Sequence, residues 1–490
     1  MSNNPIPAEN ALPGTTAWQP GANLATTQIQ AYCDTHAADP SGVVHFFVSV
    51  QAGGTTWTGA IYRLGWYQGT GARLIATIPI QTGIAQGYWD AIGRVLNNCP
   101  TAIITSATHL LEAGWSSSFA WTVPANAVTG VYLAQFTDAN GKFTYCSFIV
   151  RGNRPADYAY IRANTTDVAY NDWGGYSLYT NPTVGVKVSF NRPDVNGGGT
   201  GGLLQLEIGA IKWFERQGYN MSYLSIQDIH ENPAWLKQYG ALLSGGHNEY
   251  WTREIRDGVE AALTSGVGMA FLGANAAYWL MRFEADAGAH VDRTVTCYKV
   301  ATAANNLALD PFFGVDNTRV TSQFRDPVIN RPESTLCGIM FVDLVAGTPP
   351  VKVAWQLASV PSQTYLGGTG LIASQSYGCD LVGDEYDKQQ SGSPANLQII
   401  GASAVTRATG NAADTAHTTT YVAQSGALVF ASGSHAFTFA LDSYRWSFAC
   451  TPYTVPGIQL FMANIMAALL LGKSASSVQA AASAFSSFHN

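Results

Sequence analysis

The chain is poor in charged residues. Asp, Glu, Lys and Arg make up only 12% of its 490 residues, against about a quarter in a typical soluble protein. Hydrophobic residues make up 47%, so either much surface is buried between subunits or Ser, Thr, Asn and Gly cover the exterior. The net charge is -7 and no cluster of Lys or Arg occurs. Because phosphate binding needs a basic face, nucleic acid is not expected as a partner.

Long apolar segments and export signals are also missing. The longest apolar stretch, IMAALLLG at 465–472, is too short to span a bilayer. The opening MSNNPIPAENALPGTTAW has no basic segment followed by an apolar one, so we expect no signal peptide. The sequence therefore predicts a cytoplasmic protein without membrane contact.

The seven cysteines are scattered and include no CxxC pair. This spacing disfavours a disulfide framework and a zinc site made of thiolates. Cys146, within the apolar run FTYCSFIV, is expected to be a plain buried thiol.

Residues 1–152 consist of short β-rich runs separated by Gly, Asn, Asp and Pro, a pattern typical of an antiparallel β-sandwich. We expect this region to be an accessory domain, followed by a linker at 151–157. The runs are GVVHFFVSVQ (42–51), TWTGAIYRLGWY (56–67), ARLIATIPIQ (72–81), SFAWTVP (118–124), GVYLAQFTD (130–138) and FTYCSFIVRG (143–152).

Residues 153–490 alternate strand and helix patterns, which predicts an α/β domain built on a parallel sheet. A stretch at 285–425, rich in Thr, Ser, Gly and Pro, is expected to be a β-rich insertion that caps the sheet. The predicted strands are AYIRANTTDVAY (159–170), NMSYLS (220–225), ALLSGG (241–246), VGMAFLGAN (267–275) and GALVFASGSHAFTFALD (426–442). The predicted helices are LLQLEIGAIKWFERQG (203–218), NPAWLKQYG (232–240), TREIRDGVEAALTSG (252–266) and PGIQLFMANIMAALLLG (456–472).

Polar residues follow each predicted strand, where an open parallel sheet binds its ligands. The richest of these segments is LLSGGHNEYWT (242–252), which reads as a strand-to-helix turn like a nucleophile elbow. Its tip carries neither Ser nor Cys, so acyl-enzyme chemistry at that position is disfavoured. A neutral histidine, a carboxylate and a phenolate are instead metal ligands or proton carriers.

Five motifs together resemble the large (β) subunit family of N,N-dimethylformamidase. They are LLSGGHNEYWT, FLGANAAYW, AYNDWGGYSLY, ENALPGTTAW and IYRLGWYQGTGARL. The resemblance implies a β-sandwich followed by a domain similar to class I glutamine amidotransferases. It also implies an amide hydrolase whose mononuclear iron is held by two tyrosines and a glutamate.

The resemblance assigns metal ligands residue by residue. Tyr250 matches the tyrosine of the family's H-x-E-Y-W motif, and LVGDEYD (381–387) resembles the segment with the glutamate, which makes Glu385 a ligand. The second tyrosine is expected before the W-x-E-R-x-G-Y signature. The corresponding stretch here contains no tyrosine before Trp213, and Glu207 is its nearest polar residue. A histidine expected two residues before the glutamate is replaced by Gly383.

These departures leave alternatives open. Glu207 replaces the missing tyrosine, or Tyr170 or Tyr176 of the neighbouring loop does, or the site binds a different metal or none. Each candidate also has a structural interpretation. The Tyr250 ring packs under the turn, and Glu385 belongs to a solvated loop or a calcium-type site. Likewise, Glu207 pairs with Lys212.

Three side chains are expected to move or accept protons in catalysis. His247, Glu249 or His435 would act as a general base or support the metal ligands, and Asn275 would donate to the developing oxyanion. His247 has a structural interpretation too, as a buried histidine bonded to backbone.

The sequence therefore predicts a metal-dependent hydrolase of non-peptide C–N bonds that cleaves a small amide such as an N-substituted formamide. The resemblance implies Fe(III) as the cofactor. One alternative is a hydrolase with another metal or with none. The other is a non-catalytic protein for carbohydrate binding or subunit assembly. We expect a homo-oligomer, or an assembly with a small partner subunit.

Overall fold

The computed structural model describes residues 4–105, 107–154, 156–180, 184–299, 310–347, 352–360, 364–446, 450 and 453–473. It is rich in β structure, with several sheets and few helices. No helix among these residues is long and apolar enough to cross a membrane.

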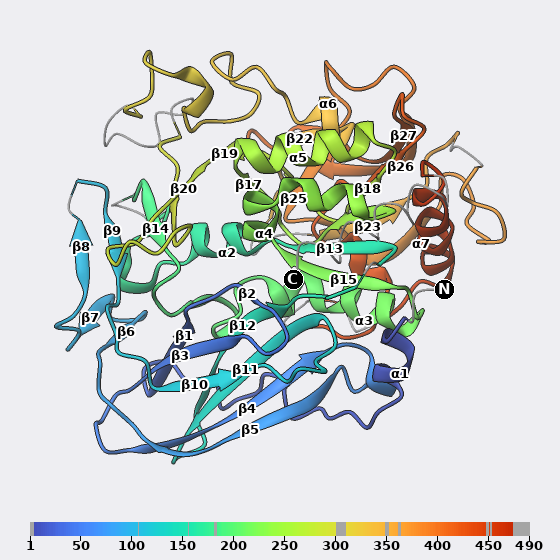
Figure 1. Ribbon diagram of the computed structural model, residues 1–490. Coiled ribbons are helices and arrows are strands. Elements are labelled where there is room, and N and C mark those ends of the chain that lie inside the picture. The colour runs from blue at the N-terminus through green and yellow to red at the C-terminus, as the bar shows by residue number, and fades with distance from the viewer. Residues whose placement is uncertain are drawn as a thin grey trace.

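The N-terminal part folds into a β-sandwich, drawn in blue to teal in Figure 1. One sheet has the order β1-β3-β10 and the other the order β2-β12-β11-β4-β5. Neighbouring strands are antiparallel except for the short β2–β12 pair, which is parallel. Side chains from both sheets share one core that includes Phe46, Trp57, Phe136 and Phe148. The strands are β1 (Ile29–Cys33), β2 (Ala37–Ala38), β3 (Val43–Val50), β4 (Thr56–Leu64), β5 (Ala72–Thr82), β10 (Phe119–Thr122), β11 (Gly130–Asp138) and β12 (Phe143–Val150).

Each of the six predicted β runs contains a strand of this sandwich. The sequence patterns missed β1 and two hairpins that project beside the sandwich in Figure 1. These hairpins are β6 (Tyr88–Asp90) with β7 (Val95–Asn97) and β8 (Ile103–Thr105) with β9 (Leu110–Glu112). Their strands are three residues long, too short for the alternation of apolar and polar residues to show.

A seven-stranded sheet with the order β15-β13-β16-β18-β28-β27-β26 forms the centre of the second part. The first five strands are parallel, β27 is antiparallel to β28, and β26 is antiparallel to β27, so that β26 runs in the direction of the first five. The parallel strands are β13 (Tyr158–Arg162), β15 (Met221–Ser225), β16 (Ala241–Ser244), β18 (Gly268–Phe271) and β28 (Leu428–Ala431). The sheet alternates with helices along the chain, as predicted. Its specific likeness to class I glutamine amidotransferases stays a prediction.

Helices cover both faces of this sheet. One face packs on α4 (Ile226–Glu231) and α5 (Arg253–Thr264), and the other on α3 (Ile208–Arg216) and α7 (Pro456–Leu469). The side chains of each strand alternate between these two cores. In β13, for example, Ala159 and Ile161 face one core while Tyr158 and Tyr160 face the other.

The run AYIRANTTDVAY, predicted as one strand, is a strand only up to Arg162. Its second half forms the helix α2 (Asn164–Tyr170). Tertiary hydrogen bonds outweigh the strand preference of its β-branched residues. The Thr165 hydroxyl donates to the carbonyl oxygen of Tyr250 at 2.8 Å, and the Thr166 hydroxyl accepts from the amide of Glu249 at 2.9 Å. These bonds fix α2 against the turn that carries Glu249 and Tyr250.

The segment predicted as an insertion has two parts. β22 (Met340–Leu344), β23 (Lys352–Gln356), β24 (Ser376–Gly383) and β25 (Glu385–Lys388) form a separate sheet with the order β22-β25-β24-β23. β26 (Gln398–Thr406) and β27 (Ala413–Val422) instead extend the main sheet. Residues 300–309, 348–351 and 361–363 of this segment lie outside the described residues.

Several short elements complete the chain. They are α1 (Ile6–Asn10), η1 (Tyr67–Gly69), η2 (Trp173–Gly175), β14 (Lys187–Ser189), η3 (Asn196–Gly198), the π-helical turn η4 (Leu203–Glu207), η5 (Pro233–Gln238), β17 (Tyr250–Trp251), β19 (Trp279–Leu280), β20 (Arg282–Glu284), β21 (Thr294–Thr296), η6 (Asn317–Arg319), α6 (Ser334–Cys337) and η7 (Phe437–Ala440).

The cysteines include one pair that their spacing did not suggest. Cys379 and Cys450 form a disulfide, which joins positions 71 residues apart. The other five cysteines are free, and Cys146 is buried as predicted.

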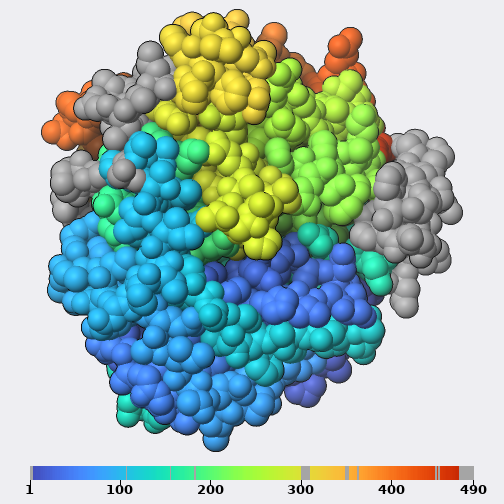
Figure 2. All heavy atoms as spheres, turned by 60° about the vertical axis from the view of Figure 1, so that its left-hand side comes forward, coloured from blue at the N-terminus to red at the C-terminus, as the bar shows by residue number. Residues whose placement is uncertain are grey.

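The sandwich and the second part are joined by a buried ion pair. The Arg63 guanidinium of β4 donates two hydrogen bonds to the Glu215 carboxylate of α3, at 2.7 and 2.8 Å, and both side chains are fully buried. On the face drawn in Figure 2, yellow atoms of the second part lie against blue atoms of the N-terminal part. A hydrogen bond also joins the two parts, because Arg293 donates to the carbonyl oxygen of Cys33 at 3.1 Å.

Candidate active site

The turn that follows β16 is built on two glycines. A Cβ atom at Gly245 would lie 2.0 Å from the Tyr160 hydroxyl, and Gly246 has a φ of +54°, which favours glycine. The chain then enters β17, and Thr252 caps α5 by accepting a hydrogen bond from the amide of Ile255. The predicted strand-to-helix turn is present, with His247 and Glu249 on it.

His247, Glu385 and His435 come together from three separate segments. His247 Nε2 lies 3.3 Å from Glu385 Oε2, and His435 Nε2 lies 3.8 Å from the same oxygen. Glu385 is the first residue of β25, directly after Asp384, whose φ of +57° makes the tight turn from β24. His435 follows β28 at the carboxyl end of the main sheet, and its ring centroid lies 4.2 Å from that of His247.

Four acid–base atoms in this cluster are buried and have no hydrogen-bond partner among the described residues. They are Nε2 of His247, Oε2 of Glu249, Oε2 of Glu385 and Nε2 of His435. Glu249 Oε2 lies 3.4 Å from His247 Nε2. Since buried polar atoms are normally bonded, a cluster of unsatisfied ones points to a ligand, an ion or a reacting group at this place.

Burial sets the protonation states of the cluster. It lowers the pKa of His435 to about 4, with the neighbouring His247 adding to the shift, and it also lowers the pKa of His247. Both imidazoles are therefore neutral at pH 7 and keep a nitrogen lone pair. Burial raises the pKa of Glu249 and of Glu385, and each would gain from a nearby positive charge.

A hydrogen-bonded chain leads from Glu249 to Tyr250. The Tyr179 hydroxyl donates to Glu249 Oε1 at 2.9 Å, and the Tyr250 hydroxyl donates to that of Tyr179 at 2.5 Å. Asn275 Nδ2 also approaches Glu249 Oε1, at 3.4 Å. The Lys299 ammonium lies 3.4 Å from the centre of the Tyr179 ring, and burial lowers its pKa to about 8.

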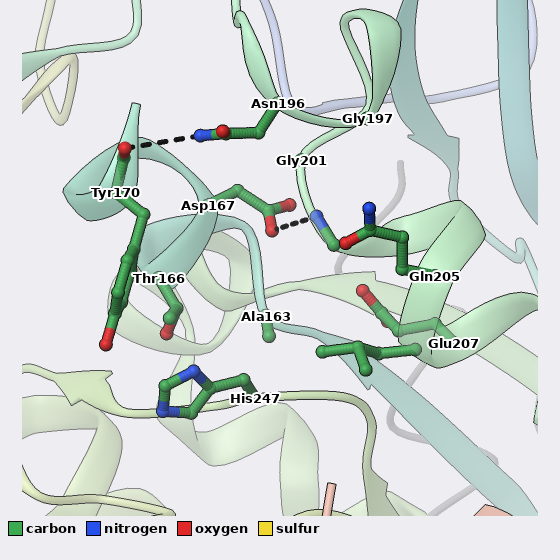
Figure 3. Close-up of a pocket in the computed structure, with 12 residues that line it drawn as sticks. Ala163, Thr166, Asp167, Tyr170, Asn196, Gly197, Gly201, Gln205, Glu207 and His247 are labelled. Atoms are coloured by element: carbon green, nitrogen blue, oxygen red, sulfur yellow. Dashed lines mark hydrogen bonds between the residues drawn. The ribbon is translucent and has the colours of Figure 1, made fainter. Parts of the chain in front are cut away.

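A pocket of about 300 Å³ opens beside His247 (Figure 3). Tyr170 of α2 stands on one side of it, Glu207 on the other, and the glycine loop at 197–202 closes part of its rim. Gly201 allows the loop to come close, because a Cβ atom there would lie 2.2 Å from Cγ of Asp167. The pocket thus lies at the carboxyl end of β13, and His247 is the cluster residue that lines it.

A family match over most of the sequence shows which family the chain belongs to. The family described as N,N-dimethylformamidase beta subunit-like, C-terminal, matches residues 58–451. The chain belongs to this family. The matched range covers most of the sandwich as well as the main sheet, so the N,N-dimethylformamidase beta subunit-like family includes both parts.

Solved structures give only remote likenesses. One is a cycloisomaltooligosaccharide glucanotransferase from Paenibacillus sp. in complex with cycloisomaltoheptaose, with 14% identity over 57% of this chain and 35% of that one, and a TM-score of 0.17. Another is the sporulation control protein Spo0M from Bacillus subtilis, with 8% identity over 26% of this chain and 49% of that one, and a TM-score of 0.15. The chain thus spans a third to a half of these proteins, and no function is carried over from them. No curated protein matches it.

The structure places the residues that the family resemblance proposed as ligands in different surroundings. Glu385 lies in the cluster. Tyr250 is fully buried with its hydroxyl bonded to Tyr179, and burial raises its pKa well above the ordinary value. Glu207 lines the pocket and accepts a hydrogen bond from the Tyr160 hydroxyl at 3.0 Å.

The structure also shows the surroundings of the other residues considered from the sequence. Glu207 does not pair with Lys212, because the Lys212 ammonium donates to Asp442 at 2.7 Å. Tyr170 lies beside His247, with ring centroids 5.6 Å apart. Tyr176 stacks on His109 instead.

Sequence reasoning missed Tyr179 and Lys299. Tyr179 ends the family-like motif AYNDWGGYSLY, so the motif itself could have identified it. Lys299 has no such signal, since it is close to Glu249 only through the fold.

The donor set of the cluster suits a metal ion. Donor atoms that share one ion at bond lengths near 2.1 Å lie about 3 to 3.5 Å apart, and the separations here are 3.3 and 3.8 Å. The His247, Glu385 and His435 donors all lie within 4.8 Å of one another. Two neutral imidazoles with one carboxylate are a known donor set for non-haem iron and for zinc. This set differs from the two tyrosines and one glutamate that the resemblance to the N,N-dimethylformamidase family implies.

Proposed function

We propose that this protein is a metal-dependent hydrolase of amide bonds. The observation that carries the proposal is the convergence of four buried acid–base atoms that have no hydrogen-bond partner among the described residues. They belong to Glu249, Glu385, His435 and His247, and His247 lines the pocket. Membership of the N,N-dimethylformamidase beta subunit-like family supports amide hydrolysis as the reaction.

His247, Glu385 and His435 would hold the ion, and iron is the metal that the family suggests. When bound, the ion would act as a Lewis acid toward the amide carbonyl and lower the pKa of a water molecule. Burial of both imidazoles keeps them unprotonated, which prepares them to bind a cation without first losing a proton.

Glu249 is the residue that we assign to proton transfer. Tyr179 and Asn275 hold its Oε1, so its Oε2 stays free next to His247. The carboxylate would take a proton from the attacking water and deliver it to the departing amine nitrogen. The products are a carboxylate and an amine.

Asn275 is placed to stabilise the oxyanion. Its backbone amide donates to Asp387 at 2.8 Å and its φ is +52°, which together define the backbone position of Asn275 after β18. The Nδ2 contact with Glu249 is long, at 3.4 Å, so this donor can turn to a substrate oxygen at little cost.

A metal-free hydrolase is the second candidate. It is supported by the hydrogen bond from the Tyr250 hydroxyl, the hydroxyl of a predicted ligand, to Tyr179. In this variant of the mechanism Glu249 and His247 would act directly as the acid–base pair, and activity would persist after removal of all metals.

The assembly state belongs to the same proposal. The family takes its name from a beta subunit, which supports either a small partner subunit or a homo-oligomer. The mass of the purified protein, measured by size-exclusion chromatography with light scattering, separates these two assemblies from a monomer.

Metal analysis with an amidase assay tests the proposal. Protein purified without chelators is analysed for iron, zinc and other metals by plasma mass spectrometry. It is then assayed on N-methylformamide and N,N-dimethylformamide for release of formate. We expect near-stoichiometric metal and activity that a chelator removes and the same metal restores. Activity that survives complete metal removal favours the metal-free mechanism. If the protein contains metal but hydrolyses neither formamide nor N-(2-aminoethyl)formamide, the proposed amide hydrolysis is contradicted.

A further inference from the structure

The pocket beside His247 is larger than a simple formamide requires. A water molecule's share of liquid volume is about 30 Å³, so a pocket of about 300 Å³ has room for roughly ten non-hydrogen atoms. A dialkylformamide with two methyl groups has about half that number. The remaining space would be filled by a substituent of the amide.

The charged side chains that line this pocket are acidic. Asp167 and Glu207 are carboxylates, no Lys or Arg is among the lining residues, and His247 is neutral. Asp167 is already satisfied, because Arg162 donates to one oxygen at 2.8 Å and the amide of Gly202 donates to the other at 2.7 Å.

Glu207 is the carboxylate with bonding capacity left. Its Oε2 accepts from Tyr160, whereas Oε1 accepts no hydrogen bond from any described residue and has only Arg162 Nε at 3.8 Å. The residue is 1% exposed, and Figure 3 shows the side chain at the wall of the pocket. A carboxylate oxygen left without a donor at a pocket wall is a binding group for a hydrogen-bond donor from a ligand.

The local charge balance favours a cationic donor. When both carboxylates are ionised, Arg162 supplies one positive charge against those of Asp167 and Glu207, so the group carries one net negative charge. Burial raises the pKa of Glu207 to about 7, and a cation bound beside it would favour its ionised form. The Tyr170 ring lines the same pocket, and an aromatic face also attracts a cation.

We propose that this pocket selects amides whose substituent ends in a primary ammonium group, and that Glu207 is the residue that binds this group. The inference rests on the proposed amide hydrolysis and names the substrate class of that site. It gives Glu207 a role in specificity instead of the role as a metal ligand.

Three substrates of similar size test the inference. N-(2-aminoethyl)formamide is cationic, N-propylformamide is its neutral counterpart, and N-(carboxymethyl)formamide is anionic. For the wild-type protein we expect kcat/KM to be about tenfold higher for the cationic substrate than for the neutral one, and lowest for the anionic one. A wild-type preference for the neutral or anionic substrate would overturn the inference, and this comparison needs no variant.

Two variants locate the preference. In Glu207→Gln the ratio of kcat/KM for the cationic to the neutral substrate should fall by about tenfold, mainly through KM. Glu254→Gln is the matched control, because Glu254 is an exposed carboxylate outside the pocket, and its ratio should equal that of the wild type. An unchanged ratio in a folded Glu207→Gln protein would exclude Glu207 as the binding group.

Calorimetry separates failure of this inference from failure of the proposed function. If no amide is hydrolysed, binding of N-(2-aminoethyl)formamide and N-propylformamide is measured directly. Tighter binding of the cationic amide that Glu207→Gln abolishes would support the inference even then. Equal binding of the two would refute it.

Discussion

The Tyr250 hydroxyl is bonded to the Tyr179 hydroxyl at 2.5 Å, and through Tyr179 it reaches Glu249. Tyr250 is therefore hydrogen-bonded, through Tyr179, to the carboxylate that we assign to proton transfer and not to the three residues that we propose as metal ligands. Two possible sets of metal ligands therefore have to be distinguished by experiment. One contains Tyr250, and the other contains His247 and His435.

Tyr250→Phe distinguishes the two sets. With His247, Glu385 and His435 as ligands, the variant should keep its metal content within about twofold of the wild type. Its activity should fall by roughly tenfold, because Tyr179 loses the bond that orients it toward Glu249. Metal content is measured by plasma mass spectrometry and activity by formate release. Loss of metal and activity together would establish the tyrosine ligand set that the family resemblance implies.

His435→Gln tests directly whether His435 is one of the metal ligands. Loss of one of three donors should weaken metal binding by at least about tenfold and lower activity by a larger factor. Calorimetric titration of the metal-free protein measures the first effect. His290→Gln is the control, because the His290 side chain is 76% exposed and lies outside the cluster. Equal metal affinity in both variants would remove His435 from the metal site.

Glu207→Gln should change the pH dependence of stability. Burial raises the pKa of Glu207 to about 7 from its ordinary value of 4.5, so the native state keeps the proton over this range while the unfolded state loses it. The free energy of unfolding of the wild type therefore decreases as pH rises from 4.5 to 7, by about 3 kcal/mol from this residue.

The variant removes this contribution. Urea unfolding should show it to be more stable than the wild type at pH 8, by up to about 3 kcal/mol, and similar to it at pH 4. A variant less stable than the wild type at pH 8 would show that the buried carboxylate stabilises the fold. If the Glu207→Gln variant is more stable than the wild type but no longer prefers the cationic amide, the Glu207 charge serves substrate binding at the expense of stability.

Gly273→Ala should disrupt the site through the backbone. A Cβ atom at Gly273 would lie 2.0 Å from the carbonyl oxygen of Gly246, so the turns after β16 and β18 would have to separate. We expect a loss of about 2 to 4 kcal/mol in unfolding free energy and weaker metal binding. Gly21→Ala, where a Cβ atom meets nothing within 4 Å, should stay within about 0.5 kcal/mol of the wild type. A Gly273→Ala protein as stable as that control would contradict this account.

The periodicity of apolar residues along the sequence was sufficient to predict much of the fold. All six predicted sandwich runs and the five predicted strands of the main sheet contain observed strands. It failed where tertiary contacts decide, as in α2, whose Thr165 and Thr166 bond to the neighbouring turn. It also could not show that β26 and β27 continue the main sheet, because edge pairing depends on neighbours distant in sequence.

The candidate site was predictable as a set of strand ends but not as a bonded network. Placing His247, Glu249, Asn275 and His435 after parallel strands was enough to bring them to one edge of the sheet. The direction of each side chain was not predictable, since Tyr250 turns to Tyr179 and Glu207 turns to Tyr160. Glu385 was found only through the family motif, because it lies on a separate small sheet.

The helical segment 203–216 carries Glu207 at the end of its π turn and Glu215 at its other end. Glu215 forms an ion pair with Arg63 of the sandwich. One continuous helical segment therefore connects Glu207 at the pocket wall to the sandwich. A shortened protein that begins at residue 153 would lose Arg63, the partner of Glu215, and also the sandwich side chains that share a core with Trp213 and Phe214. The smallest functional unit of this chain therefore includes its first 150 residues, and efforts to minimise or transplant the site have to carry the sandwich with it.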